Sequence, residues 1–187
     1  MLFVGQRRPR GRNVEVKVLA VFAALIAALL FQTTVAGLSL HGGTLVNFVL
    51  IAVICLALAL GALPGLLAGA AGGLVQDAVA GGIVGVGGLS KTLVGFLVGV
   101  FGAQFIVSQP MPRFVMFVGG TVLHELCFQS LYALIEVRSI QFAWRTMLTQ
   151  AAINGVIGIL ALQIVESAPG LKQRREARRT TFARRRF

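Results

Sequence analysis

The chain has 187 residues, of which 57% are hydrophobic and only 12% are charged, and its mean hydropathy is +0.87. A soluble domain carries about 25% charged residues, so this composition excludes an ordinary soluble protein and predicts an integral membrane protein. The net charge of +11 comes mainly from the two ends of the chain, because 13 of the 17 Lys and Arg residues lie in residues 7–17 and 172–186. Lys and Arg cluster on the cytoplasmic side of membrane proteins, so we interpret this charge as a signal of topology and not of nucleic-acid binding.

Taken in chain order, the apolar runs predict a compact, all-α bundle of six transmembrane helices. The predicted spans are residues 18–34, 44–62, 64–79, 89–107, 114–135 and 146–165. Each has roughly 16–22 residues, the third being the shortest, which fits a hydrocarbon core about 30 Å thick. The spans divide the chain into a basic tail (1–17), a six-helix transmembrane domain (18–166) and a second basic tail (167–187). An even number of crossings places both tails in the cytoplasm; five crossings, with the third span not crossing, would separate them.

The stretch 65–99 is apolar and crowded with glycine. Gly65, Gly69 and Gly73 follow one another at intervals of four residues, and Gly95 and Gly99 repeat the spacing in the next span. Small residues four apart lie on one face of a helix and let two transmembrane helices approach closely. We therefore expect the third and fourth spans to pack tightly, with a glycine-rich turn near residues 81–88 between them.

Asp77 and Lys91 stand on either side of this predicted turn, and Ser90 precedes the lysine. Ionisable groups at membrane depth are costly, so each is a candidate for a functional role. Asp77 either caps a neighbouring turn near the interface or pairs with Lys91. Lys91 in turn either takes part in that pair or extends its amine to the lipid headgroups.

Polar residues also form rows on the fifth and sixth spans. The fifth span carries Glu125, Gln129, Tyr132 and Glu136, and the sixth carries Gln150, Asn154 and Gly158. These spacings of three and four place each row on one helix face, so the two rows are expected to hydrogen-bond to each other, each bond contributing on the order of 0.6 kcal/mol. Two other interpretations stay open: a small-molecule pocket lined by the same residues, and a proton relay through His124 and Glu125.

No motif for catalysis is present. The chain lacks the Gly-x-Ser-x-Gly elbow, the HExxH zinc motif, the phosphate-binding P-loop and the CxxC pair. Cys55 and Cys127 lie in apolar runs and are interpreted as membrane thiols. We therefore expect a protein that is not an enzyme and that uses neither a cofactor nor a metal ion.

The central stretch GLVQDAVAGGIVGVGGLSKTLVGFLVG, residues 73–99, resembles the MreD family, the membrane subunit of the bacterial rod-shape-determining machinery. The residues that carry the resemblance are Gly73, Leu74, Asp77, Gly81, Gly82, Gly85, Leu89, Ser90, Phe96 and Gly99. Outside this stretch only the length, the number of spans and the terminal position of the charge agree. The long basic C-terminal tail departs from the compact form of the family.

The resemblance implies a non-enzymatic scaffold of the cell-elongation complex in the bacterial inner membrane. MreD-like proteins bind a single-span partner, MreC, and through it support sidewall peptidoglycan synthesis with MreB, RodA and a penicillin-binding transpeptidase. The MreD fold is also similar to the substrate-binding subunit of energy-coupling-factor transporters. This similarity implies an alternative function as the small-molecule-binding membrane subunit of a vitamin transporter.

Overall fold

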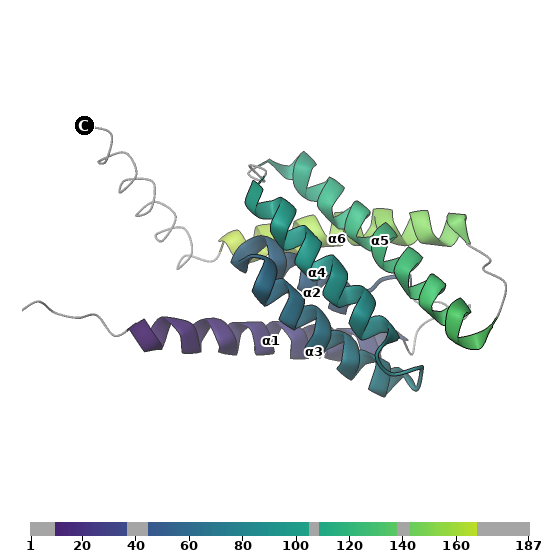
Figure 1. Ribbon diagram of the computed structural model, residues 1–187. Coiled ribbons are helices and arrows are strands. Elements are labelled where there is room, and N and C mark those ends of the chain that lie inside the picture. The colour runs from purple at the N-terminus through teal and green to yellow at the C-terminus, as the bar shows by residue number, and fades with distance from the viewer. Residues whose placement is uncertain (1–9, 37–44, 105–108, 138–142, 168–187) are drawn as a thin grey trace, which may run out of the picture.

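The computed structural model describes residues 10–36, 45–104, 109–137 and 143–167, and over these ranges it contains helices and no strands (Figure 1). The helices are α1 (Arg10–Ala36), α2 (Phe48–Leu60), α3 (Ala62–Ala80), α4 (Val86–Gln104), α5 (Pro110–Glu136) and α6 (Trp144–Ser167). The prediction of an all-α protein is confirmed.

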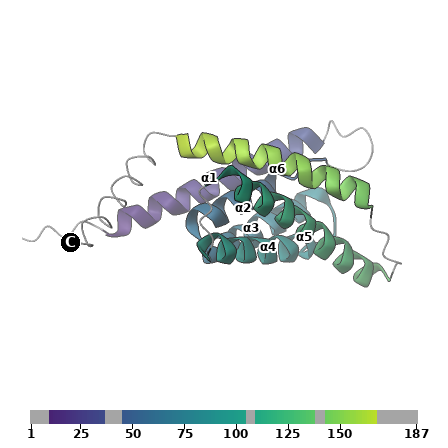
Figure 2. The ribbon, with the colours of Figure 1, turned by 90° about the horizontal axis from the view of Figure 1, so that it is seen from above.

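Successive helices run in opposite directions along the bundle, and Figures 1 and 2 show this alternation from two sides. The Arg10 end of α1 and the Ser167 end of α6 lie at the same end of the bundle (Figure 1). The short turn of residues 81–85, which joins α3 to α4, lies at the opposite end, called the turn end below. Residues that follow the starts of α2, α4 and α6 therefore lie toward the turn end.

Helix α2 is the centre of the bundle. Its sequence, FVLIAVICLALAL, has no polar residue, and a helix that is apolar on every face is one that other helices surround. It contacts all five other helices, which follow one another around it in the order α1, α3, α4, α5, α6. Leu50 and Ile54 of α2 form the main core with Val94 of α4 and Phe117 of α5, and all four side chains are 0% exposed.

Four helices are long and apolar enough to cross a membrane: α3, α4, α5 and, over Trp144–Ile164, α6. Helix α2 has 13 residues, and the apolar part of α1 that is described, Val21–Thr34, is also short. The prediction that the third span is the shortest is wrong, since α3 has 19 residues. The shortest helix is α2, because the Asn47 side chain caps it at a later residue than predicted and Gly61, with φ of +102°, ends it earlier.

The helix ends differ from the predicted spans where polar residues extend a helix beyond the apolar run. Helix α1 begins at Arg10, so the predicted boundary between a tail and the transmembrane domain, at residues 17 and 18, falls inside a helix. Pro110 begins α5, which lengthens that helix at the expense of the predicted loop, because proline suits a first helical turn. Gly87 and Gly88, predicted in the turn, belong to the first turn of α4. The predicted C-terminal tail lies outside the described residues except for Ser167, which ends α6.

Candidate functional site

Helices α3 and α4 lie antiparallel and make the most extensive contact of any helix pair (Figure 1). At Gly65 an added Cβ would stand 2.5 Å from the carbonyl oxygen of Gly95, and at Gly73 it would stand 2.5 Å from the Cα of Gly88. At Gly69 it would meet the backbone carbonyl of Lys91. The two backbones are therefore in direct contact, and a side chain has no room between them.

Two further glycines, on α4, lie in the same contact. A Cβ at Gly95 would meet the carbonyl of Gly65, and a Cβ at Gly99 would meet the backbone of Ala62. The structure thus places Gly65, Gly69, Gly73, Gly95 and Gly99, the five residues predicted to pack helices, at a single interface.

Asp77, in the last turn of α3, binds the beginning of α4. Its Oδ2 accepts hydrogen bonds from the backbone N–H groups of Gly85 at 2.9 Å and Gly88 at 3.1 Å. The first N–H groups of a helix have no partner within the helix and carry a partial positive charge, so a carboxylate there stabilises both. Of the two interpretations that the sequence left open, capping describes the hydrogen bonds of Asp77. Ser90, one turn further along α4, donates to the carbonyl of Gly87 at 3.1 Å.

The turn between α3 and α4 is also attached to α5. The backbone N–H of Ile83 donates to the hydroxyl of Tyr132 at 3.0 Å. Gly81 and Gly85 have φ of +68° and +106°, a conformation that other residues adopt at a cost. The turn end of the α3–α4 hairpin is therefore held by Asp77 from within and by Tyr132 from outside.

A second set of polar contacts crosses the middle of the bundle. Asn154 of α6 is 0% exposed; its Oδ1 accepts from the backbone N–H of Asn47 at 3.2 Å, and its Nδ2 donates to the hydroxyl of Thr121 on α5 at 3.4 Å. Gln32 of α1 reaches the same region, accepting from the N–H of Phe48 at 2.8 Å and donating to the carbonyl of Val46 at 3.2 Å. These contacts join α1, α5 and α6 to the beginning of α2.

His124, also in this region, has one ring nitrogen paired and one unpaired. The amide of Asn47 is oriented by its Oδ1, which accepts from the N–H of Leu50 at 3.0 Å, and its Nδ2 then lies 3.4 Å from His124 Nε2. An amide nitrogen only donates, so Nε2 is the acceptor and the neutral imidazole carries its proton on Nδ1. This Nδ1 is buried and has no hydrogen-bond partner among the described residues.

Lys91 is buried inside the bundle, with 2% of its surface exposed, and so does not extend to the headgroups. The buried side-chain atoms without a hydrogen-bond partner among the described residues are Gln76 Oε1 and His124 Nδ1, and the Lys91 amine is not one of them. Asp77 of α3, Glu125 of α5 and His124 are near enough to Lys91 to interact with its charge. The pairing of Asp77 with Lys91 is therefore electrostatic and not a hydrogen bond.

Glu125, Gln129 and Gln150 form a further group of polar side chains near Lys91. Gln129 Nε2 donates to Glu125 Oε2 at 3.3 Å, and the side chain of Gln150 on α6 lies close to the Glu125 carboxylate. Glu125 and Gln129 are partly exposed, whereas Gln150 is 6% exposed. Of the two predicted polar rows, Glu125 and Gln150 lie close together, whereas Asn154 bonds to Thr121, which the predicted row of α5 did not include.

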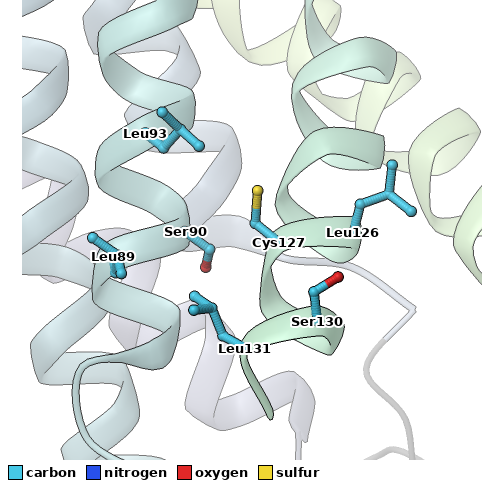
Figure 3. A pocket seen from close by; sticks show the side chains of 7 residues that line it. All are labelled: Leu89, Ser90, Leu93, Leu126, Cys127, Ser130 and Leu131. Atoms are coloured by element: carbon cyan, nitrogen blue, oxygen red, sulfur yellow. The ribbon is translucent and has the colours of Figure 1, made fainter. Parts of the chain in front are cut away.

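A separate groove of about 470 Å³ lies between α4 and α5 (Figure 3). Its walls are mainly leucines, and Ser90 of α4 and Cys127 of α5 both project into the space between the two helices (Figure 3). Its lining does not include Lys91, Glu125 or His124, so the groove is distinct from the region of these polar residues.

Several residues of the site were not singled out from the sequence. Asn47 and Thr121 carry hydrogen bonds across the bundle core, and Gln32 was taken only as the end of a span. The signal for Asn47 was its position just before an apolar helix, where asparagine is a preferred cap. Nothing in the sequence pointed to its pairing with Asn154, which is 107 residues away.

Within the described residues, no group of three or more His, Cys, Asp or Glu side chains is arranged to hold a metal ion. Comparisons with known proteins add no assignment: no family model matches the chain, and neither a curated protein nor a solved structure matches it.

Proposed function

We propose that this protein is a non-enzymatic membrane scaffold of a bacterial cell-elongation complex. In this proposal an outer face of the bundle binds the transmembrane helix of a single-span, MreC-like protein. Through that partner it supports sidewall peptidoglycan synthesis by RodA and a penicillin-binding transpeptidase, in a complex that also contains the cytoplasmic filament protein MreB. The protein would thereby contribute to rod shape.

One observation carries the proposal: the residues of the MreD-like stretch are engaged in building the α3–α4 hairpin. Gly73 lies against the backbone of α4, Asp77 caps α4, and Ser90 bonds within it. Side chains that hold two helices in one fixed geometry suit a protein whose task is to present a rigid surface. This supports a scaffold and gives no specific support to a catalyst.

The proposed topology has six crossings, with both termini in the cytoplasm of the inner membrane. Besides the four helices that are long enough alone, α1 and α2 run along the bundle in the same alternating directions (Figure 1). Helix α2, about 20 Å long, is enclosed by the other five helices, so its short length exposes little backbone to lipid. A periplasmic position of a reporter fused to the C-terminus would contradict this topology.

The test is a mild-detergent pull-down of the tagged full-length protein from its native membranes, with mass-spectrometric identification of what is bound. The proposal expects an MreC-like single-span protein together with peptidoglycan synthases. An untagged strain serves as the control for non-specific recovery. Repeated recovery of the protein without any component of the elongation machinery would contradict the proposal.

A second candidate function is the small-molecule-binding subunit of a vitamin transporter. The observation that favours it is that Glu125 and Gln129, which bond to each other, are partly exposed and lie close to the buried side chains of Gln150 and Lys91. The same pull-down separates the two, since a transporter subunit would be recovered with a pair of ATPases and a coupling membrane protein.

A further inference from the structure

The buried side chain of Asn47 makes two contacts that use opposite ends of its amide. Its Oδ1 accepts from the backbone N–H of Leu50 at 3.0 Å and so caps α2, and its Nδ2 lies 3.4 Å from Nε2 of His124 on α5. The backbone N–H of Asn47 is held as well, since it donates to Oδ1 of Asn154 on α6 at 3.2 Å. The amide therefore has one orientation that satisfies both of its neighbours at once.

This orientation satisfies both neighbours only while His124 is neutral. An amide nitrogen donates and does not accept, so Nε2 has to be unprotonated to pair with it. The neutral ring carries its proton on Nδ1, and a second proton can enter only at Nε2, whichever group Nδ1 faces. Protonation of His124 would thus set a donor on the ring against the donor of Asn47.

Turning the amide over does not satisfy both neighbours either. Oδ1 would then accept from the protonated Nε2 of His124, but the amide nitrogen would face the N–H of Leu50. The first N–H groups of a helix have no partner within the helix, so the loss of a cap destabilises the first turn. Protonation of His124 and the complete set of contacts at Asn47 therefore exclude one another.

The charged side chains near His124 do not reverse this conflict. Lys91 of α4 is near enough to interact with a charge on the ring, and its own positive charge opposes a second one there. Asp77 of α3 and Glu125 of α5 act on Lys91, but within the described residues neither is among the groups that act on His124. Lys91 thus disfavours the protonated ring, as Asn47 does.

We propose that Asn47 and His124 form an acid-sensitive joint at the start of α2. While His124 is neutral, the joint is closed and ties α2 to α5. When His124 takes up a proton, Asn47 releases either the ring or the cap, and the first turn of α2 opens. A histidine freed from such a contact binds a proton near pH 6.5, so lowering the pH below about 6 favours the open form, which holds the additional proton. The inference does not depend on the scaffold function, because it concerns a contact within the core.

The test is hydrogen exchange of the Leu50 amide, followed by NMR between pH 7 and pH 5 in the purified full-length protein in mixed micelles. After correction for the intrinsic pH dependence of exchange, the opening constant of this amide should rise about fivefold to tenfold from pH 6 to pH 5, since opening takes up one proton. The amide of Val98, in the core part of α4, is the internal reference and should show no such rise. Equal rises at Leu50 and Val98 would indicate opening of the whole bundle and would overturn the proposal.

Three substitutions assign the effect to the joint. His124→Gln supplies an acceptor oxygen that does not titrate, so the rise at Leu50 should vanish. Asn47→Asp supplies two acceptor oxygens, one for Leu50 and one for protonated His124, so it should also remove the rise, and it tests the joint should His124→Gln fail to fold. His41→Gln, which removes the other histidine of the chain, is the matched control and should keep the rise. A flat profile in the wild type, a rise that survives in either joint variant, or a rise that is lost in His41→Gln would contradict the proposal.

Discussion

The carboxylate of Asp77, in the last turn of α3, accepts a hydrogen bond from the backbone N–H of Gly88, in the first turn of α4, over 3.1 Å. The same oxygen accepts from Gly85 at 2.9 Å. One side chain thus ends one helix and begins the next, at the point where the chain reverses. The α3–α4 hairpin depends on this contact at its turn end and on glycine packing along its length.

Asp77→Ala should destabilise the protein by about 0.5–2 kcal/mol, because the first N–H groups of α4 lose their acceptor. Asp77→Asn keeps one acceptor oxygen and should lose less. The measurement is unfolding of the purified protein by denaturant in mixed micelles. Equal stability of wild type and Asp77→Ala would show that the cap contributes nothing.

Gly73→Ala should destabilise by about 1–3 kcal/mol, since the added Cβ would stand 2.5 Å from the Cα of Gly88 and force the two backbones apart. Gly119→Ala is the matched control, because nothing lies within 4 Å of a Cβ at that helical position. It should be neutral or stabilising by up to about 1 kcal/mol, as alanine is the better helix former. Similar effects of the two substitutions in thermal unfolding would contradict the packing account.

Asn154→Ala should cost about 1–3 kcal/mol, because it leaves the buried N–H of Asn47 without an acceptor. The comparison is Thr149→Ala on the same helix, whose hydroxyl is exposed and bonds only to the carbonyl of Arg145. This control should change stability by less than about 0.5 kcal/mol. If both variants unfold at the wild-type denaturant concentration, the contacts across the core carry no net stability.

Tyr132→Phe should loosen the turn end without unfolding the bundle. The N–H of Ile83 loses its acceptor, so its hydrogen exchange should be about threefold to tenfold faster than in the wild type. The amide of Leu50, which bonds to Asn47, provides the internal reference and should exchange at an unchanged rate. Protection of Ile83 that survives the substitution would mean that Tyr132 does not hold the turn.

Much of the fold follows from local patterns that the sequence displays directly. Long apolar runs predicted the helices, and glycines four residues apart predicted the face on which α3 and α4 meet. Asp77 was restricted to a few roles by its place beside a glycine-rich turn. These features are local, because helix periodicity and turn chemistry act over a few residues.

The contacts in the core of the candidate site could not be predicted from the sequence, for a physical reason. The bond between Asn47 and Asn154 joins residues from opposite parts of the chain, and no periodicity encodes such a pair. The glycines of α4 decide which face of this helix packs against α3, and this in turn decides where the Lys91 side chain points. Its burial therefore follows only from the packed bundle. The ends of the helices were also misplaced, since polar residues extended α1 well beyond its apolar run.

The central claim is that the α3–α4 hairpin holds the bundle in the form that a partner recognises. The most direct measurement compares recovery of the proposed MreC-like partner by tagged wild type, Gly69→Leu, Gly73→Leu and the exposed control Gly119→Leu, at equal levels of each protein in the membrane. The account predicts that partner recovery and rod shape are lost in Gly69→Leu and Gly73→Leu and kept in Gly119→Leu. Partner recovery and rod shape at the wild-type level in both hairpin variants would contradict it.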